Sequence, residues 1–143
     1  MKSAKAAKMH VLVTGDRNWW DEQIMEAFMR GIYETIDGRE MAMVLVHGGA
    51  RGADTLAGKA CNKINEENKA LRLSPIIIEE VEAQWDEFGK AAGVIRNGEM
   101  LRKFPIDLAF AFHDDLENSK GTKDMVKKLA DAEIPTYHIR RLT

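Results

Sequence analysis

The stretch MAMVLVHGGARGAD, residues 41–54, passes from an apolar segment through a glycine-rich loop into the start of a helix. Its first six residues are apolar without interruption, which is typical of a parallel β-strand that is covered on both faces. The glycines allow the backbone to turn sharply and to approach a ligand closely. A strand, a tight loop and a helix in this order predict a βαβ unit, and therefore a parallel sheet.

The same alternation continues on both sides of this unit. Short apolar segments predict strands, and apolar residues spaced by three or four predict helices. The predicted strands are residues 9–14, 41–46, 75–81, 107–112 and 134–139, and the predicted helices are residues 21–36, 53–67, 91–103 and 123–132. This order predicts an α/β fold, a Rossmann-like three-layer sandwich around a five-stranded parallel sheet. We expect residues 9–143 to form one domain and residues 1–8 to form a flexible, basic, solvated tail.

The predicted first helix is apolar over a wide arc. Its core-facing positions are expected to be Ile24, Ala27, Phe28, Ile32 and Ile36. A second apolar stripe beside them consists of Met25, Met29 and Tyr33. Because so wide an apolar arc is expected to be covered on both sides, the second stripe predicts a homo-oligomer that forms through this helix. The alternative is that neighbouring loops cover the stripe.

The composition limits the classes of function. The 143 residues include 21 Lys and Arg and 23 Asp and Glu, which gives a formal charge of −2. So small a charge supplies no field for holding nucleic acid by phosphate neutralisation alone, and any anion site must be local. The single cysteine, Cys61, excludes an intramolecular disulfide, and the four histidines show no metal-ligand spacing. No apolar segment approaches the roughly 20 residues of a membrane span, and no export signal precedes the domain, so we expect a cytoplasmic protein.

Ligands of open parallel sheets bind beyond the carboxyl ends of the strands, which directs attention to the loops 15–20, 47–52, 82–93 and 113–121. The loop 47–52 opens a helix, whose free N–H groups are expected to face an anion, with Arg51 as a possible bidentate partner. A second helix start, Ser119-Lys120-Gly121-Thr122, can cap its helix or bind a phosphate oxygen. A plain cap and a glycine-rich turn are the structural alternatives at both positions.

The other two loops supply further candidates. Arg17 follows the first strand, and Trp85 either stacks on a base or covers the edge of the core. Asp54 and Asp114 are weak candidates for a catalytic acid or base, although the helix dipole alone explains an aspartate at position 54. The complete set of expected ligand-binding residues is Gly15, Arg17, His47, Gly48, Gly49, Ala50, Arg51, Gly52, Asp54, Trp85, Lys90, Arg96, Asn97, Ser119, Lys120, Gly121 and Thr122.

These segments resemble the SLOG superfamily, in its YspA-like (cpYpsA-related) branch, whose members occur in bacteria and phages. The resemblance rests on TGDR at 14–17, HGGARGAD at 47–54, GKAAG at 89–93 after Trp85, Arg96-Asn97, and SKGT at 119–122. It implies the strand order 3-2-1-4-5 and a site for a nucleotide or nucleotide-derived ligand. More distant relatives are the Lonely Guy phosphoribohydrolases and DNA-processing protein A. The phosphoribohydrolase signature PGGxGTxxE differs here by His47 in place of the proline, an additional Arg51 and no matching glutamate.

We therefore expect a protein that binds a small phosphorylated nucleotide, such as ADP-ribose, NAD or a cyclic nucleotide, as a sensor, a sequestering protein or a processing protein. Apart from that ligand, no cofactor is predicted. The alternatives are a nucleotide hydrolase that cleaves an N-glycosidic bond and a single-stranded nucleic-acid binder. The net charge of −2 and the absence of a basic stripe in the sequence disfavour the last of these.

Overall fold

The computed structural model describes residues 7–141. Its strands are β1 (Lys8–Gly15), β2 (Ala42–His47), β3 (Ile77–Glu80), β4 (Leu108–Phe112) and β5 (Thr136–Ile139). Its α-helices are α1 (Glu22–Gly38), α2 (Ala53–Lys69), α3 (Trp85–Phe88), α4 (Ala92–Lys103) and α5 (Gly121–Asp131). All neighbouring strands pair in parallel, in the order β3-β2-β1-β4-β5. The predicted fold class and strand order are confirmed.

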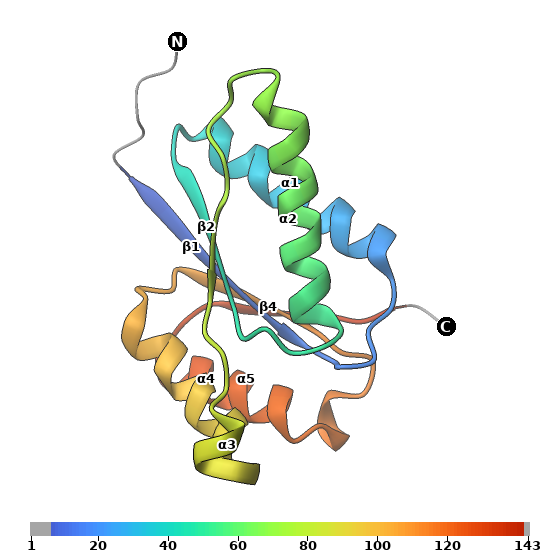
Figure 1. Ribbon diagram of the computed structural model, residues 1–143, viewed down its shortest axis with the longest axis vertical. Helices are drawn as coiled ribbons and strands as arrows, with labels where there is room; N and C mark the ends of the chain where they lie inside the picture. Colours follow the sequence, from blue (N-terminus) through green and yellow to red (C-terminus); the bar gives the residue numbers. More distant parts are fainter. Residues whose placement is uncertain (1–6, 142–143) are drawn as a thin grey trace.

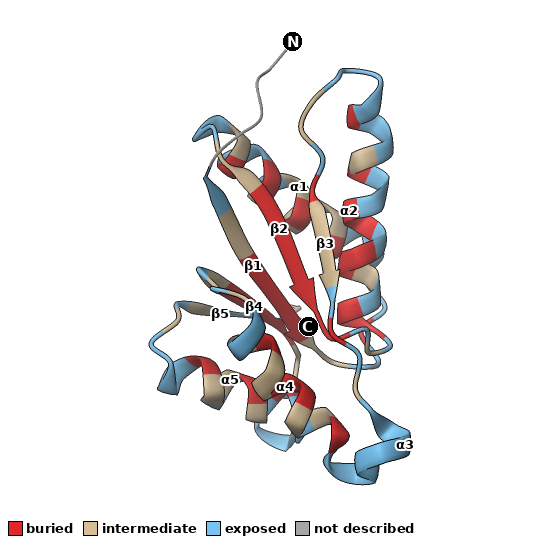
Figure 2. Ribbon diagram, turned by 60° about the vertical axis from the view of Figure 1, so that its left-hand side comes forward, coloured by how far each residue is buried: buried red, intermediate tan, exposed pale blue. Residues whose placement is uncertain are grey.

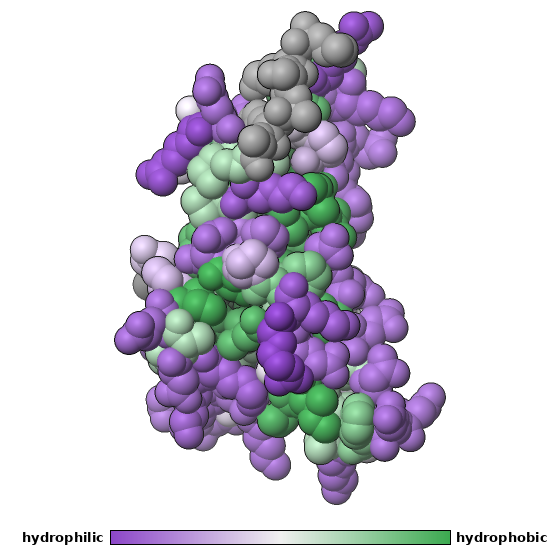
Figure 3. All heavy atoms as spheres, turned by 90° about the vertical axis from the view of Figure 1, so that its left-hand side faces the viewer, coloured by the Kyte–Doolittle hydropathy of each residue, from purple (hydrophilic) through white to green (hydrophobic). Residues whose placement is uncertain are grey.

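The central strands are buried on both faces because the helices form a layer on each side (Figures 1 and 2). Along β1, Val11 and Val13 belong to the core beneath α1 and α2, and Leu12 belongs to the core beneath α4 and α5. This alternation is the two-residue period of a strand, and it explains why the strand reads as continuously apolar. On the face shown in Figure 3, hydrophobic side chains reach the surface in patches between hydrophilic ones.

The third and fifth strands are shorter than predicted, the last helix begins at Gly121 rather than at residue 123, and two further features differ from the sequence prediction. Residues 1–6 of the expected tail, residues 1–8, lie outside the described residues. Lys8 is not part of a tail, because it belongs to β1 and pairs with Ala42. The segment after β3, expected as a loop, contains the short helix α3, which stands out from the body of the molecule (Figure 2).

The orientation of α1 corrects the prediction made for its two stripes. Met25 and Met29 are fully buried and Tyr33 is 7% exposed, within the core shared by the sheet, α1 and α2. The Tyr33 hydroxyl donates a hydrogen bond to the Ser74 carbonyl at 3.0 Å. An oligomer through this stripe is therefore excluded by its burial inside one chain. Both stripes are apolar, so periodicity alone does not decide which one faces the sheet.

Candidate functional site

A cleft of about 480 Å³ lies at the carboxyl ends of β1 and β4, and we call it the strand-end cleft. A second pocket of about 400 Å³, called the side pocket, shares Arg17, Ala50, Trp85 and Arg96 with it. Twelve of the predicted residues line the strand-end cleft: Gly15, Arg17, Ala50, Asp54, Trp85, Lys90, Arg96, Asn97, Ser119, Lys120, Gly121 and Thr122. Gly48, Gly49 and Arg51 line only the side pocket.

Four cationic side chains line the strand-end cleft, namely Arg17, Lys90, Arg96 and Lys120. They come from three different loops and from α4, and two aspartates, Asp16 and Asp54, lie among them. Three of the cations are exposed, whereas Arg96 is only 8% exposed. The cleft is therefore locally cationic on a chain whose net charge is −2.

Arg96 ties the glycine-rich loop to the start of α5. Its Nη1 donates to the Gly48 carbonyl, and its Nε donates to Asn97 Oδ1 at 3.2 Å. The Asn97 amide in turn donates to the Gly121 carbonyl at 3.2 Å and to Asp124 Oδ2 at 3.0 Å. Burial lowers the pKa of Arg96, while Asp54 opposes that shift. A Cβ at Gly48 would lie 2.4 Å from Arg96 Nη1, so only glycine fits beside the guanidinium.

The Asp54 carboxylate accepts hydrogen bonds from backbone N–H groups that the sequence predicted to be free for a ligand. Its Oδ2 accepts a hydrogen bond from the Gly48 N–H at 2.9 Å, and the Ala50 N–H also bonds to this carboxylate. Burial raises the pKa of Asp54 to about 6, against the opposing influence of Arg96. The Gly49 N–H donates to His47 Nδ1, and the Ala53 N–H donates to the Asp16 carbonyl. The start of α2 therefore does not present the open anion cradle predicted for residues 47–52.

Two further members of that loop have structural roles. Arg51 extends across the loop after β1, where its Nε donates to the Arg17 carbonyl and its Nη2 donates to Asn18 Oδ1. Gly52 has a φ of 85°, and a Cβ there would lie 2.2 Å from the Asp16 carbonyl oxygen. The loop after β1 and the glycine-rich loop are thus packed backbone to backbone. Gly52 lines neither pocket.

His47 is also outside both pockets. It is 4% exposed, and its Nε2 lies 4.0 Å from Glu80 Oε1. Burial lowers the pKa of His47, and the nearby positive charge of Arg96 lowers it further, so the neutral ring is favoured. Its Nδ1 accepts the Gly49 N–H, which makes it a support for the loop.

The start of α5 is the helix terminus that remains open toward the cleft. Ser119 Oγ caps the Thr122 N–H at 3.1 Å, and the Asp124 N–H bonds to the Lys120 carbonyl. Since the first N–H groups of a helix have no partner inside it, those of Gly121, which lines the cleft, and Lys123, which does not, have no acceptor among residues 7–141. Ser119 therefore caps the helix, and the segment 119–122 also lines the cleft.

Trp85 lies at the boundary between the two pockets. It is 47% exposed and belongs to neither core cluster, so it does not cover the core edge. The Arg17 guanidinium lies over its ring, with Cζ 5.3 Å from the ring centroid. A flat aromatic face in a cleft, covered by one exposed side chain, is a surface on which a planar group can stack.

Asp114 does not reach either pocket. Its carboxylate accepts hydrogen bonds from the backbone N–H and the guanidinium of Arg141, and these hold the pKa of Asp114 below its ordinary value. The Arg141 guanidinium also lies over the rings of Trp19 and Trp20, each 4.8 Å away. Asp114 therefore anchors the segment after β5, and its candidacy as a catalytic group is withdrawn.

Some lining residues were not predicted. Asp16 and His113 line the strand-end cleft, and Glu82 lines the side pocket. Asp16 lies within the TGDR segment, between two predicted residues, whereas nothing in the immediate neighbours of His113 and Glu82 distinguishes them. Within residues 7–141, no three His, Cys, Asp or Glu side chains are grouped as a metal ion would need. None of the helices described has the length and apolar character needed to span a bilayer.

The amino-acid sequence is similar to a known protein family and to a phage protein. Residues 9–65 match the family model YAcAr, described as the YspA, cpYpsA-related SLOG family. The Gene 61 protein of Mycobacterium phage D29 is 36% identical over 129 residues, which cover 90% of this chain and 94% of that protein. No solved structure matches the chain. The matched region contains β1, the glycine-rich loop and most of α2, and the phage relative extends the similarity along the chain, so the protein belongs to the YspA, cpYpsA-related SLOG family.

Proposed function

We propose that this protein binds a small phosphorylated nucleotide in the strand-end cleft, as a sensor, a sequestering protein or a processing protein. The observation that carries the proposal is the convergence of Arg17, Lys90, Arg96 and Lys120 on one cleft of a chain whose net charge is −2. Family membership supports a nucleotide-related role. The cleft of about 480 Å³ suits a small ligand better than a nucleic-acid strand.

The phosphate group belongs at the start of α5. There the N–H groups of Gly121 and Lys123, the exposed Lys120 and the helix dipole all favour negative charge. Charge-assisted hydrogen bonds contribute about 1.5–3 kcal/mol each, so two or three give useful affinity without a large basic surface. The sequence pointed to both helix starts, and at α2 the Asp54 carboxylate already accepts the Gly48 N–H, so the proposal retains the start of α5.

The base belongs on the side of Trp85. A base that stacks on this ring replaces the Arg17 guanidinium, which is then free to meet a phosphate oxygen. A ligand that carries both a planar base and a phosphate group therefore matches two features of the strand-end cleft, the Trp85 ring and the start of α5.

Thermal unfolding with a panel of ADP-ribose, NAD, cyclic nucleotides, AMP and ribose 5-phosphate tests the proposal. A ligand at 100 times its dissociation constant adds about 2.7 kcal/mol to the free energy of unfolding. The variant Lys120→Ala should weaken binding about tenfold or more. Lys127→Ala, an exposed lysine on the same helix that lines neither pocket, is the matched control. If no member of the panel at millimolar concentration shifts the transition of the folded protein, the proposal is rejected.

Asp54 supports a second candidate function, hydrolysis of an N-glycosidic bond in the bound nucleotide. It is a buried carboxylate that lines the cleft, and its pKa of about 6 is near the value that suits a general acid or base at neutral pH. Chromatography of nucleotides incubated with the protein detects the free base. Release of base that Asp54→Asn abolishes, with nucleotide binding retained, supports the hydrolase. Binding without any turnover eliminates it.

A further inference from the structure

The topology leaves one part of the sheet without a helix. The helices α1 and α2 connect β1, β2 and β3 and lie on one face, whereas α4 and α5 lie on the other (Figure 1). On the α1 face, β4 and β5 therefore extend beyond the helical layer. A groove of about 950 Å³ runs there between α1 and these strands.

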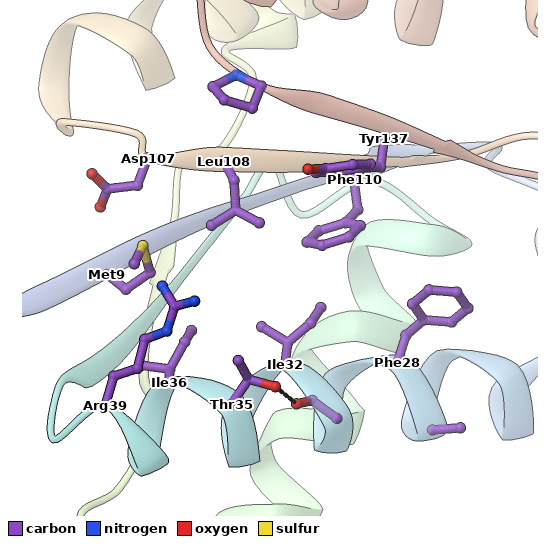
Figure 4. Close-up of a pocket in the computed structure, with 13 residues that line it drawn as sticks. Met9, Phe28, Ile32, Thr35, Ile36, Arg39, Asp107, Leu108, Phe110 and Tyr137 are labelled. Atoms are coloured by element: carbon purple, nitrogen blue, oxygen red, sulfur yellow. Dashed lines mark hydrogen bonds between the residues drawn. The ribbon is translucent and has the colours of Figure 1, made fainter.

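The walls of this groove are apolar side chains, of which Phe110 is buried and Phe28, Ile32 and Leu108 are half-buried. Figure 4 shows Phe28 and Ile32 on α1 opposite Leu108 and Phe110 on β4. Tyr137 of β5 stacks on Phe110 with ring centroids 5.6 Å apart, and it remains 55% exposed. Apolar surface of this kind, bordered by polar side chains, marks an interaction site in soluble proteins.

The rim of the groove allows a second backbone to approach. Ala27, Gly31 and Thr35 line it one turn apart on the exposed side of α1, and a Cβ added at Gly31 would meet nothing within 4 Å. Small residues at this spacing give a helix a flat face, on which another surface can pack closely.

The charges show which surface fits. The guanidinium of Arg39 reaches into one end of the groove (Figure 4), and among residues 7–141 it has no ion pair or side-chain hydrogen bond. Of the carboxylates along α1, Glu22 and Glu26 are paired with Lys59, Lys63 and Arg30 of the same chain, whereas the exposed Glu34 has no ion pair in the part of the chain that the structure describes. A second copy of α1 thus brings apolar and small side chains to the groove and the Glu34 carboxylate to Arg39.

We propose that the groove between α1 and β4–β5 binds a second copy of this chain, with α1 of each protomer covering the exposed strands of the other. The contact is isologous, because each chain supplies both the helix and the groove. The proposal concerns the stripe of Phe28 and Ile32, which replaces the buried stripe of Met25, Met29 and Tyr33 as the surface of association. It does not depend on the nature of the ligand in the strand-end cleft.

Light scattering of the full chain between 1 and 200 μM, roughly the range of weak and strong dimers, tests this proposal. We expect twice the chain mass of 16.1 kDa for the wild-type protein. Ile32→Glu should weaken the dimer at least about tenfold, because a carboxylate would be buried at the contact. Gly31→Gln should do the same by preventing close approach, and it leaves the fold intact because the position is open.

Leu71→Glu is the matched control, since Leu71 is 68% exposed and outside the groove. It should leave the dimer unchanged, and circular dichroism confirms that each variant is folded. A wild-type protein that stays monomeric over the whole concentration range overturns the proposal. So does a dimer that persists in both Ile32→Glu and Gly31→Gln, because it must form through another surface.

Discussion

Asp54 connects the glycine-rich loop to the strand-end cleft. Its carboxylate accepts a hydrogen bond from that loop and also lines the cleft. Its neighbour Arg96 makes the corresponding connection to α5 through Asn97. These buried polar groups hydrogen-bond one another, so replacing any one of them leaves a buried partner unpaired and lowers the stability of the fold. The rigidity of the cleft therefore depends on a few buried side chains that also line it.

Replacement of Asp54 by Asn should change how stability depends on pH. The folded-state pKa of Asp54, about 6, is above its ordinary value, so the folded protein holds this proton more tightly than the unfolded chain does. Stability that Asp54 contributes when protonated is therefore lost as the pH rises from about 4 through 6. The stability of Asp54→Asn relative to wild type should increase by up to about 3 kcal/mol over this range.

Urea unfolding at pH 4, 5, 6 and 7 measures this difference. Asp131→Asn, at an exposed position at the end of α5, is the control and should follow wild type throughout. A constant offset between Asp54→Asn and wild type at all four pH values would show that the carboxylate does not titrate in this window.

Gly48→Ala should destabilise the protein by about 1–3 kcal/mol, the usual cost of overpacking. The added Cβ would lie 2.4 Å from Arg96 Nη1, and the guanidinium cannot retreat because it bonds to the Gly48 carbonyl and to Asn97. Gly38→Ala provides the comparison, because nothing lies within 4 Å of a Cβ there. Equal stability of the two variants in thermal unfolding would contradict this explanation.

At the scale of the elements, the helix starts at α2 and α5 look alike in sequence but differ in structure. Both follow a strand-end loop with glycine and a hydroxyl or acidic residue nearby. At α2 the protein's own Asp54 and His47 accept the loop N–H groups, and at α5 only the Thr122 N–H is capped. The open terminus is the one that can bind an anion.

Ser119→Ala should cost about 1 kcal/mol of stability through loss of the α5 cap, and it should also weaken nucleotide binding. Asp21→Ala removes the equivalent cap of α1, where Asp21 Oδ1 accepts the Ile24 N–H at 3.0 Å, remote from the cleft. The two variants should lose similar stability in urea, but only Ser119→Ala should reduce the ligand-induced shift. A reduced shift in both would mean that the effect on binding is a general consequence of lower stability.

The sequence predicted those features that depend on local periodicity. The five strands, their parallel pairing and the loops that line the cleft follow from continuous apolar segments and from glycines at strand ends. The side of α1 that faces the sheet does not, because Met25 and Phe28 are equally apolar and tertiary packing chooses between them. Likewise, whether the N–H of Gly48 is free depends on where the Asp54 side chain lies in the folded chain.

At the scale of the whole molecule, the proposed nucleotide site predicts that Trp85 distinguishes a nucleotide from a simple phosphate. Trp85→Ala should weaken binding of the nucleotide by about 1–3 kcal/mol, the range measured for base stacking on an aromatic ring, and leave ribose 5-phosphate binding unchanged. Trp20→Ala, at a 70% exposed tryptophan outside both pockets, is the control for the loss of an indole. Calorimetric titration of both ligands decides the matter, and equal losses for the two would show that Trp85 supports the cleft without contacting a base.

The distribution of charge over the molecule makes a different prediction for nucleic acid. The cations of the strand-end cleft are balanced by acidic groups elsewhere, since the chain carries 23 Asp and Glu against 21 Lys and Arg. A single strand that extends beyond a cleft of about 480 Å³ therefore meets a surface that is negative on average. Mobility-shift titration should give no complex with a single-stranded oligonucleotide even at low salt, under conditions where the nucleotide binds. A complex whose affinity falls steeply with salt would instead show that several phosphates are neutralised at once, which a small-ligand cleft does not require.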